Sequence, residues 1–431
     1  MKTLPTLIYI ALFSVAILNA SHADERHSLQ AGAATADITP EKGVSLDGPI
    51  SKNGPVIGVH DPLHARALVL DDGQTRLAIV ICDACMIGHD VFDAAKALVH
   101  KETGLPVSHM LMAATHTHAA VRATRIGTAE ADDAYHEMLV ERIAQAVIQA
   151  EKNLAPAKLG YGSFDRPQYV ACRRYLCKPG SVAPNPFGDR SERIKSVAGR
   201  SNGVIEPAGP VDPQFSILSV QYADGKPLAV LGNYSVHYCG GYRRGLVSAD
   251  YFGHYAAALE SELDAGDGHP PFVGIMSNGT SGNTGSIRLT RGSREPFEWM
   301  QVAARALAAD TLKSLELIEH RSDIHLACIE SELTLAVRRP DESRLKWADE
   351  TLTKNDAQLP HRWSKIYAQE AQHLSKYPEE VTVKLQAFRL GPIAIAAMPC
   401  EVFAETGLAI KKESPHRHTF SIELANGYGG Y

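Results

Sequence analysis

Several apolar segments of this chain run directly into polar residues that can do chemistry, and this pattern constrains the fold more than any other feature. The polar residues that follow these segments are His116-Thr117-His118 after 110–115, His237 after 228–235, 277–283 after 272–276, Cys400-Glu401 after 393–398, and 426–431 after 419–424. Short apolar runs of this kind are typical of buried strands. Since ligand sites in α/β proteins collect where strands end, the pattern predicts catalytic residues at strand ends.

Strand and helix patterns are mixed along the rest of the chain. Residues 65–70 and 76–82 flank Asp71-Asp72-Gly73 and predict a hairpin, while helical spacing of apolar residues extends over 133–153. Residues 178–213 are rich in Gly, Pro and Ser and indicate a long surface loop, and the charged stretch 339–378 indicates a helical insertion. We predict one large α/β domain over residues 24–431, with a mixed β-sheet and flanking helices.

Composition limits the partners of this domain. The formal net charge of the 431-residue chain is −6, which argues against nucleic acid as a principal partner. No basic amphipathic helix is evident in the sequence, so we expect at most a transient contact with a membrane surface. The oligomeric state is not specified by the sequence.

The N-terminus has the pattern of a secretory signal peptide. Lys2 supplies a positive charge, residues 7–18 are almost uniformly apolar, and Ser21-His22-Ala23 places small residues at a cleavage site. We therefore predict a signal peptide over residues 1–23 and a secreted or periplasmic protein; the alternative is a retained N-terminal anchor.

Export permits disulfides, but the chain has seven cysteines, an odd number. Cys172 and Cys177 flank a short segment and could pair. Cys82 and Cys85 form a CxxC within an apolar run, and the chain lacks the second pair that a zinc knuckle needs. We interpret Cys82 and Cys85 as core residues.

The pair His116 and His118 is the strongest candidate for a metal site. In an extended chain, side chains two residues apart lie on the same face, so both imidazoles would point the same way. His237 and Glu401 would complete a set of three or four nitrogen and oxygen ligands. Such a set favours zinc, and an open coordination position would make the site catalytic.

Several segments resemble those of a known family and occur in its order along the chain. They are Ala33-Ala34-Thr35-Ala36-Asp37-Ile38-Thr39, His60-Asp61-Pro62-Leu63-His64-Ala65-Arg66-Ala67, Thr115-His116-Thr117-His118, Ser248-Ala249-Asp250 with Gly253, Glu401, and Ala425-Asn426-Gly427-Tyr428-Gly429-Gly430-Tyr431. Together they resemble the neutral/alkaline (non-lysosomal) ceramidases, zinc-dependent amidases that hydrolyse the N-acyl bond of ceramide. The resemblance implies a zinc-dependent amidohydrolase that uses metal-activated water, and with the predicted signal peptide it would be exported.

The resemblance also implies roles for individual residues. His116, His237, Glu401 and Tyr431 would bind zinc, and His118 would stand beside the metal to bind substrate or move a proton. The remaining implied residues are Arg173 near the substrate amide, with Arg174 as the competing choice, and a catalytic serine at Ser281. An alternative alignment of the serine loop instead puts Gly285 at the serine position, with Ser286 beside it. His60 and His64 precede a strand and are expected to be structural, although His60 could face the cleft.

Three questions stay open at this level. The substrate could be ceramide or a smaller, more polar N-acyl compound, and the same zinc site could instead hydrolyse an ester or lactone. A secreted binding protein with a degenerate site is the alternative from another class. Since members of the family continue past the position of Tyr431, we also expect a C-terminally truncated sequence.

Overall fold

The computed structural model describes residues 28–47, 52–121, 123–124, 132–196, 203–286 and 295–430. The predicted signal peptide and Tyr431 lie outside these residues, so both remain predictions. Within the described part of the chain, every helix is too short or too polar to cross a bilayer.

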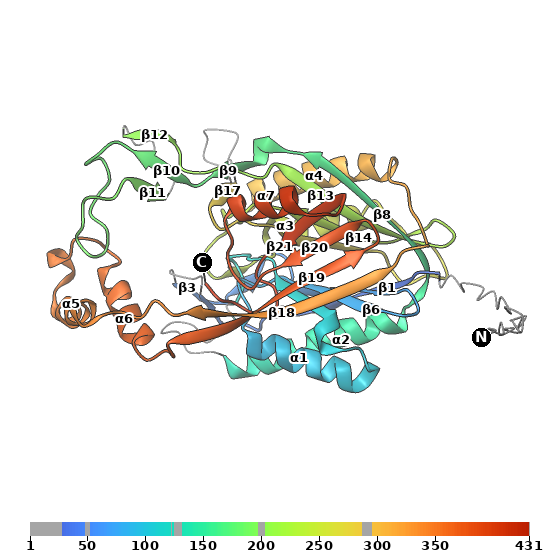
Figure 1. Cartoon of the computed structure of the whole chain (residues 1–431), viewed down its shortest axis with the longest axis horizontal. Helices are drawn as coiled ribbons and strands as arrows, with labels where there is room; N and C mark the ends of the chain where they lie inside the picture. The colour runs from blue at the N-terminus through green and yellow to red at the C-terminus, as the bar shows by residue number, and fades with distance from the viewer. Residues whose placement is uncertain are drawn as a thin grey trace, which may run out of the picture.

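An eight-stranded mixed sheet forms the centre of the molecule (Figure 1). Its strands lie in the order β16 (Val273–Asn278), β14 (Pro227–Tyr234), β13 (Gln214–Tyr222), β8 (Ala155–Asp165), β1 (Gln30–Asp37), β5 (His64–Asp71), β6 (Arg76–Cys82) and β7 (Met110–Ala114). The pairs β14–β16 and β6–β7 are parallel and the other neighbours are antiparallel. The mixed sheet and the predicted hairpin at β5 and β6 are therefore confirmed.

Four helices cover one face of this sheet: α1 (His89–Thr103), α2 (Asp133–Lys152), α3 (Asp250–Glu260) and α4 (Glu298–Leu315). Strand β5 shows why both faces are covered: Ala67 and Val69 face α1 and α2, whereas Leu68 and Leu70 face the opposite side, and all four are buried. Since side chains alternate along a strand, a fully apolar strand needs a partner on each face.

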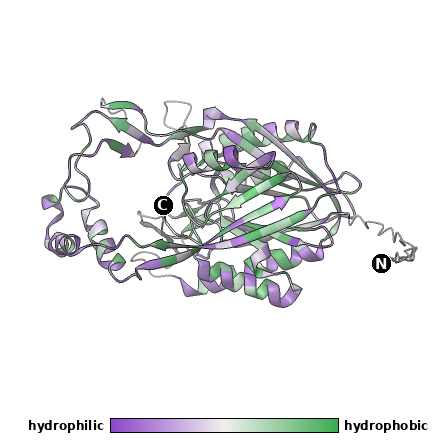
Figure 2. Ribbon diagram, viewed as in Figure 1, coloured by the Kyte–Doolittle hydropathy of each residue, from purple (hydrophilic) through white to green (hydrophobic). Residues whose placement is uncertain are grey.

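The partner on the second face is a four-stranded sheet of β18 (Leu326–Ala336), β19 (Glu380–Leu390), β20 (Ile393–Ala397) and β21 (His418–Ile422), against which α7 (Ala404–Glu413) lies. Phe388, Ile395 and Phe420 of this sheet are fully buried in one cluster with Leu77 and Leu111 of the central sheet. Figure 2 shows the hydrophobic colour concentrated on the strands of the two sheets. The apolar segments noted at 393–398 and 419–424 correspond to β20 and β21, but neither β18 nor a separate second sheet was predicted from the sequence.

Two peripheral segments lie together at one end of the molecule, at the left of Figure 1. The helical insertion predicted at 339–378 is confirmed by α5 (Glu342–Thr353) and α6 (Ser364–Leu374). The surface loop predicted at 178–213 is wrong in part, because β11 (Ile194–Ser196) and β12 (Val204–Pro207) pair with β10 (Arg174–Cys177). Phe187 joins the two segments through its ring contact with Trp347, 4.9 Å between centroids.

The remaining strands are short. They are β2 (Ser45–Asp47) and β3 (Lys52–Pro55), β4 (Gly58–Val59) and β15 (Leu246–Val247), and β9 (Val170–Cys172) and β17 (Thr284–Ser286), each pair forming its own ribbon. All seven cysteines, including Cys172 and Cys177, are free thiols, so the disulfide considered from the sequence is not formed. Cys82 and Cys85 are fully buried, as predicted.

Asn426, just after β21, ties three elements together. Its side-chain oxygen accepts hydrogen bonds from the Lys96 ammonium on α1 (2.8 Å) and from the Met112 amide on β7 (3.2 Å), and its amide nitrogen donates to Gln386 on β19 (3.0 Å). The backbone of Asn426 is left-handed, with φ of 61°. These bonds fix the second sheet against the end of β7, where His116 lies.

The burial of Lys96 gives a prediction about stability. Burial lowers the pKa of the Lys96 ammonium from 10.5 to about 8. Between these pH values the unfolded chain binds more protons than the folded chain, so the contribution of Lys96 to stability increases as the pH rises. We expect the free energy of unfolding of the natural protein, relative to Lys96→Met, to increase by up to about 3 kcal/mol from pH 8 to pH 10.5.

Denaturant unfolding across this pH range measures the difference. Lys101→Met, an exposed substitution on the same helix, is the matched control and should show no such slope. Parallel stability curves for the natural protein and Lys96→Met would contradict the assignment.

Candidate metal centre

His116 is positioned by the backbone just past the end of β7. Its amide donates to the carbonyl of Ala84 (2.9 Å), and its Nδ1 lies 2.6 Å from the carbonyl oxygen of Cys85. Because a carbonyl only accepts, Nδ1 carries the hydrogen and Nε2 is the nitrogen available to a ligand. The residue is left-handed, with φ of 72°, so the extended His-x-His geometry expected from the sequence is wrong, although both imidazoles still face the same place. Such strained backbone is common at functional sites.

Three nitrogen and oxygen atoms of other side chains lie close to the Nε2 atom of His116. The Nε2 atoms of His118 and His237 each lie 3.1 Å from it, and Glu401 Oε2 lies 3.3 Å from it. Glu401 Oε2 is also 3.8 Å from His237 Nε2. Three of the four side chains, those of His116, His237 and Glu401, are almost completely buried.

These distances fit a bound metal ion. Ligand atoms about 2.0–2.2 Å from one zinc ion at tetrahedral angles lie about 3.3–3.6 Å from one another, close to the separations among His116, His237 and Glu401. The ligand atoms of these three residues all lie within 4.8 Å of one another. His118 belongs to a second group with His116 and Cys85. Two imidazoles and one carboxylate are a set of ligands that can hold a divalent metal ion.

The charges of the cluster are interdependent. Burial alone would lower the pKa of His116, but the Glu401 carboxylate and the hydrogen bond to Cys85 raise this pKa well above its usual value. Burial and the positive charge of His116 lower the pKa values of His118 and His237 well below theirs. Of the three imidazoles, that of His116 is therefore the one whose protonated form the pocket favours, next to the Glu401 carboxylate.

Ser281 lies behind His237, on the side away from His116. Its Oγ is 3.4 Å from His237 Nδ1, accepts from Asn278 Nδ2 (3.1 Å) and donates a short hydrogen bond to Glu423 Oε1. Glu423 Oε2 accepts from the amides of Ser281 (3.1 Å) and Val402 (2.9 Å). Burial raises the pKa of Glu423 to about 8. Glu423 was not predicted from the sequence. The feature that could have revealed it is an acidic residue within the otherwise largely apolar segment 419–424.

Asp250 fixes the chain that follows His237. Its carboxylate accepts hydrogen bonds from the amides of Cys239 (3.0 Å) and Gly240 (2.8 Å), and burial raises its pKa to about 6. Asp250 occurs in one of the segments that resemble the family, Ser248-Ala249-Asp250, but the sequence did not indicate this role.

Glu401 is enclosed by the C-terminal segment. Its amide donates to the carbonyl of Gly430 (2.8 Å), and the Tyr428 hydroxyl donates to Glu401 Oε1 (3.0 Å). A Cβ atom on Gly282 would lie 2.5 Å from the Glu401 carbonyl oxygen, so only glycine allows the 277–283 loop this close. Tyr431, the predicted fourth ligand, lies outside the described residues. Tyr428 was missed, although it belongs to the same sequence motif.

The two candidate arginines point to different places. Arg173 donates from its guanidinium to the carbonyl of Gly282 (2.9 Å), and its positive charge contributes to the lowered pKa of both His118 and His237. Arg174 instead lies over the ring of Phe403, 4.9 Å from its centroid. Of the two, Arg173 is the one whose charge acts on the cluster.

Residues 29–290, more than half of the chain, match the family described as neutral/alkaline non-lysosomal ceramidase, N-terminal. The chain belongs to this family. Neutral ceramidase from Pseudomonas aeruginosa is 26% identical over 282 residues, which cover 62% of this chain and 38% of that protein. The chain thus matches well under half the length of this relative.

Solved structures of the family share the fold. A crystal structure of neutral ceramidase from Pseudomonas aeruginosa superposes with a TM-score of 0.65 at 20% identity, covering 94% of this chain and 68% of that one. A ceramidase complexed with C2 superposes with a TM-score of 0.64 at 19% identity, covering 94% and 69%. The family predicted from the sequence segments, and the single α/β domain with mixed sheet, are both confirmed.

The contacts behind His237 generate a prediction. If Ser281 and Glu423 hold the imidazole in place, Ser281→Ala and Glu423→Gln should each weaken zinc affinity about 10–100-fold, which is typical for partners of metal ligands. Competition with a chromophoric chelator measures the dissociation constant. Ser216→Ala removes a buried hydroxyl that bonds to Tyr161 on β8 and is the matched control. Equal affinities in all of these proteins would show that Ser281 and Glu423 do not position the ligand.

Proposed function

We propose that this chain is a zinc-dependent amidohydrolase that cleaves an N-acyl bond, as the family resemblance implies, and that it is exported. The convergence of His116, His237 and Glu401 within a buried site is the observation that carries the proposal. Family membership supports amide hydrolysis as the reaction class. The proposal of export rests on the N-terminal signal pattern alone.

The three converging side chains would hold the zinc ion, and Tyr431 is the proposed fourth ligand. Zinc bound there supplies a Lewis acid, which lowers the pKa of water towards about 7 and polarises a carbonyl group. Glu401 and His237 are deeply buried, so bulk water is excluded around them. Their ligand atoms face His116 Nε2. Tyr428 and the Cys85 carbonyl fix Glu401 and His116 in this orientation.

His118 is the proposed proton carrier. Its ring stacks on Tyr238 with 3.9 Å between centroids, which fixes the plane of the imidazole. Its Nε2 faces the ligand nitrogens of the centre, and the side chain is only partly buried. A neutral imidazole there can take a proton from the attacking water and deliver it to the leaving nitrogen. Arg173, whose charge reaches the same cluster, is the proposed group that orients the substrate amide and stabilises the oxyanion.

In this proposal Ser281 acts through His237. Its hydroxyl hydrogen is given to Glu423 and its oxygen faces His237 Nδ1, so the three groups form a chain that orients the imidazole. The direct catalytic role predicted from the sequence would require the hydroxyl to leave Glu423 and turn towards the substrate. The hydrogen bond between Ser281 and Glu423 supports a role for Ser281 in positioning His237, and this role is the first to test.

The substrate is the least constrained part of the proposal. Ceramide is the substrate implied by the family, and a smaller polar N-acyl compound, an ester or a lactone are the alternatives. A neighbour in structure is a ceramidase complexed with C2. A panel of a ceramide, short acyl amides and matched esters, assayed with the same preparation, separates these classes.

Metal removal tests the proposal. We expect one zinc ion at this centre and N-acyl hydrolysis that is lost on chelation and restored by zinc. Glu401→Gln should lower the turnover rate at least about 100-fold, since the ligand charge that holds and tunes the metal is lost. Glu413→Gln, at an exposed position on α7, is the control. Hydrolysis that persists without bound metal would refute the proposal.

A second variant separates the enzyme from a degenerate binding homologue. If His116→Asn abolishes metal binding at the His116 centre and also abolishes turnover on the substrate panel, the enzyme is supported. If metal binding is lost while the natural protein and His116→Asn are equally inactive on every substrate, the binding homologue is supported instead.

A further inference from the structure

A second group of potential metal ligands lies outside the proposed active site. It consists of His60, Asp61 and His254, whose ligand atoms lie within 4.8 Å of one another. Asp61 Oδ1 is 3.2 Å from His254 Nε2 and 3.6 Å from His60 Nδ1. The side chains of His60, Asp61 and His254 are 28%, 16% and 18% exposed, so this cluster lies nearer the surface than the His116 centre.

The backbone brings these residues together from distant parts of the sequence. The pairing of β4 with β15 places His60 beside Val247, whose carbonyl accepts the His60 amide hydrogen (2.9 Å). His254 lies one turn into α3, which begins just after β15. The cluster therefore rests on a strand pair and a helix, which are rigid supports for a binding site.

The carboxylate of Asp61 is held in one orientation. Its Oδ1 accepts the Ser248 hydroxyl (2.9 Å) and its Oδ2 accepts the Ala249 amide (3.1 Å). Each carboxylate oxygen can accept more than one contact, so Oδ1 keeps capacity on the side that faces the two imidazoles. His254 Nε2 is buried and makes no hydrogen bond of acceptable geometry among the described residues, although Asp61 Oδ1 is 3.2 Å away.

The imidazole of His60 is also fixed. It stacks on Phe297 with 3.7 Å between centroids and an interplanar angle of 11°, and it meets His254 edge to face at 5.8 Å. Phe297 precedes α4 and has a left-handed backbone, with φ of 67°. A phenylalanine in this backbone conformation is strained, and its ring packs against His60.

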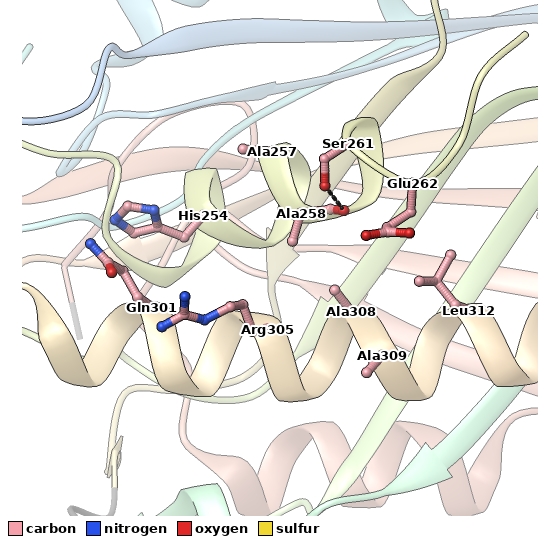
Figure 3. Close-up of a pocket in the computed structure, with 10 residues that line it drawn as sticks. All are labelled: His254, Ala257, Ala258, Ser261, Glu262, Gln301, Arg305, Ala308, Ala309 and Leu312. Atoms are coloured by element: carbon pink, nitrogen blue, oxygen red, sulfur yellow. Dashed lines mark hydrogen bonds between the residues drawn. The ribbon is translucent and has the colours of Figure 1, made fainter.

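A groove of about 400 Å³ between α3 and α4 runs up to the cluster. Figure 3 shows His254 on one helix facing Gln301 and Arg305 on the other. The groove leaves room for water or a small anion next to the ligands. The charge of Arg305 acts on His254, so a cation at the cluster binds against a positive neighbour.

We propose that His60, Asp61 and His254 bind a divalent transition metal ion, separate from the His116 centre. Two imidazoles and one carboxylate with open positions are a recognised ligand set for zinc or iron(II). The nitrogen–oxygen separations of 3.2 and 3.6 Å match the roughly 3.3–3.6 Å expected between tetrahedral ligands of one zinc ion. His254 also lines the groove between α3 and α4. This site should bind zinc more weakly than the buried His116 centre. The positive charge of Arg305 acts on His254, and the three side chains are more exposed than His116, His237 and Glu401.

A hydrogen-bonded chain connects the second site to the first. Ser248, which donates to Asp61, accepts a hydrogen bond at its carbonyl from the Thr117 hydroxyl (2.7 Å). Thr117 lies between His116 and His118. Ser248 and Thr117 thus link the two sites through hydrogen bonds.

Metal counting with zinc as the probe tests the proposal. The full chain is stripped with a chelator, reloaded with zinc and analysed by native mass spectrometry and by metal analysis. We expect two zinc ions per chain in the natural protein, the second with the weaker affinity, and one in His60→Asn/His254→Asn. His269→Asn, which disrupts a surface histidine–aspartate pair with Asp224 at 3.0 Å, is the matched control and should keep two.

The outcomes distinguish this site from the proposed catalytic centre. Glu401→Gln should lose the tighter ion and keep the weaker one, whereas the double variant should do the reverse. If the natural protein and His60→Asn/His254→Asn bind the same number of zinc ions with the same affinities, the second site does not exist and the cluster is a structural histidine–aspartate pair. If zinc binds only at the second site, this inference holds and the proposed function fails.

Discussion

Buried donor atoms that face one another at about 3 Å are the constraint on which the rest of this structure depends. The Nε2 atoms of His116 and His237 and the Oε2 atom of Glu401 meet away from bulk solvent. Burying polar groups is costly unless each is hydrogen-bonded or coordinates an ion. A metal ion bound by all three side chains offsets this cost, because it contacts the ligand atom of each one. A proton on one imidazole contacts fewer of these atoms.

The fold meets this constraint by bringing two sheets to one point. His116 follows β7 and His237 follows β14, which lie far apart in the order of the eight-stranded sheet, while Glu401 comes from the second sheet. Strand β16, at one edge of the eight-stranded sheet, contacts β5, β6 and β7, which lie towards the other edge. The two ends of the strand order therefore come close together. Asn426 then ties the second sheet to β7. The ligand positions are thus properties of tertiary packing and not of any single element.

The sequence revealed the ends of strands well because apolar runs and the polar residues after them are local signals. It identified His116, His118, His237 and Glu401, which the structure brings together, and it identified the family. It did not reveal β18 or the separate second sheet, since many residues of β18 are exposed and its pattern is not that of a buried strand. It also missed Glu423 and Tyr428, because which partner a buried side chain contacts depends on long-range packing. Tyr431 lies outside the described residues, so its role stays a prediction.

A crystal structure of the zinc-loaded protein, with anomalous diffraction data on both sides of the zinc absorption edge, tests directly whether His116, His237 and Glu401 bind one zinc ion. We expect an anomalous peak about 2.0–2.2 Å from His116 Nε2, His237 Nε2 and Glu401 Oε2. A well-ordered zinc-loaded crystal with no peak among these three atoms would contradict it. So would side chains of His116, His237 or Glu401 that point away from one another.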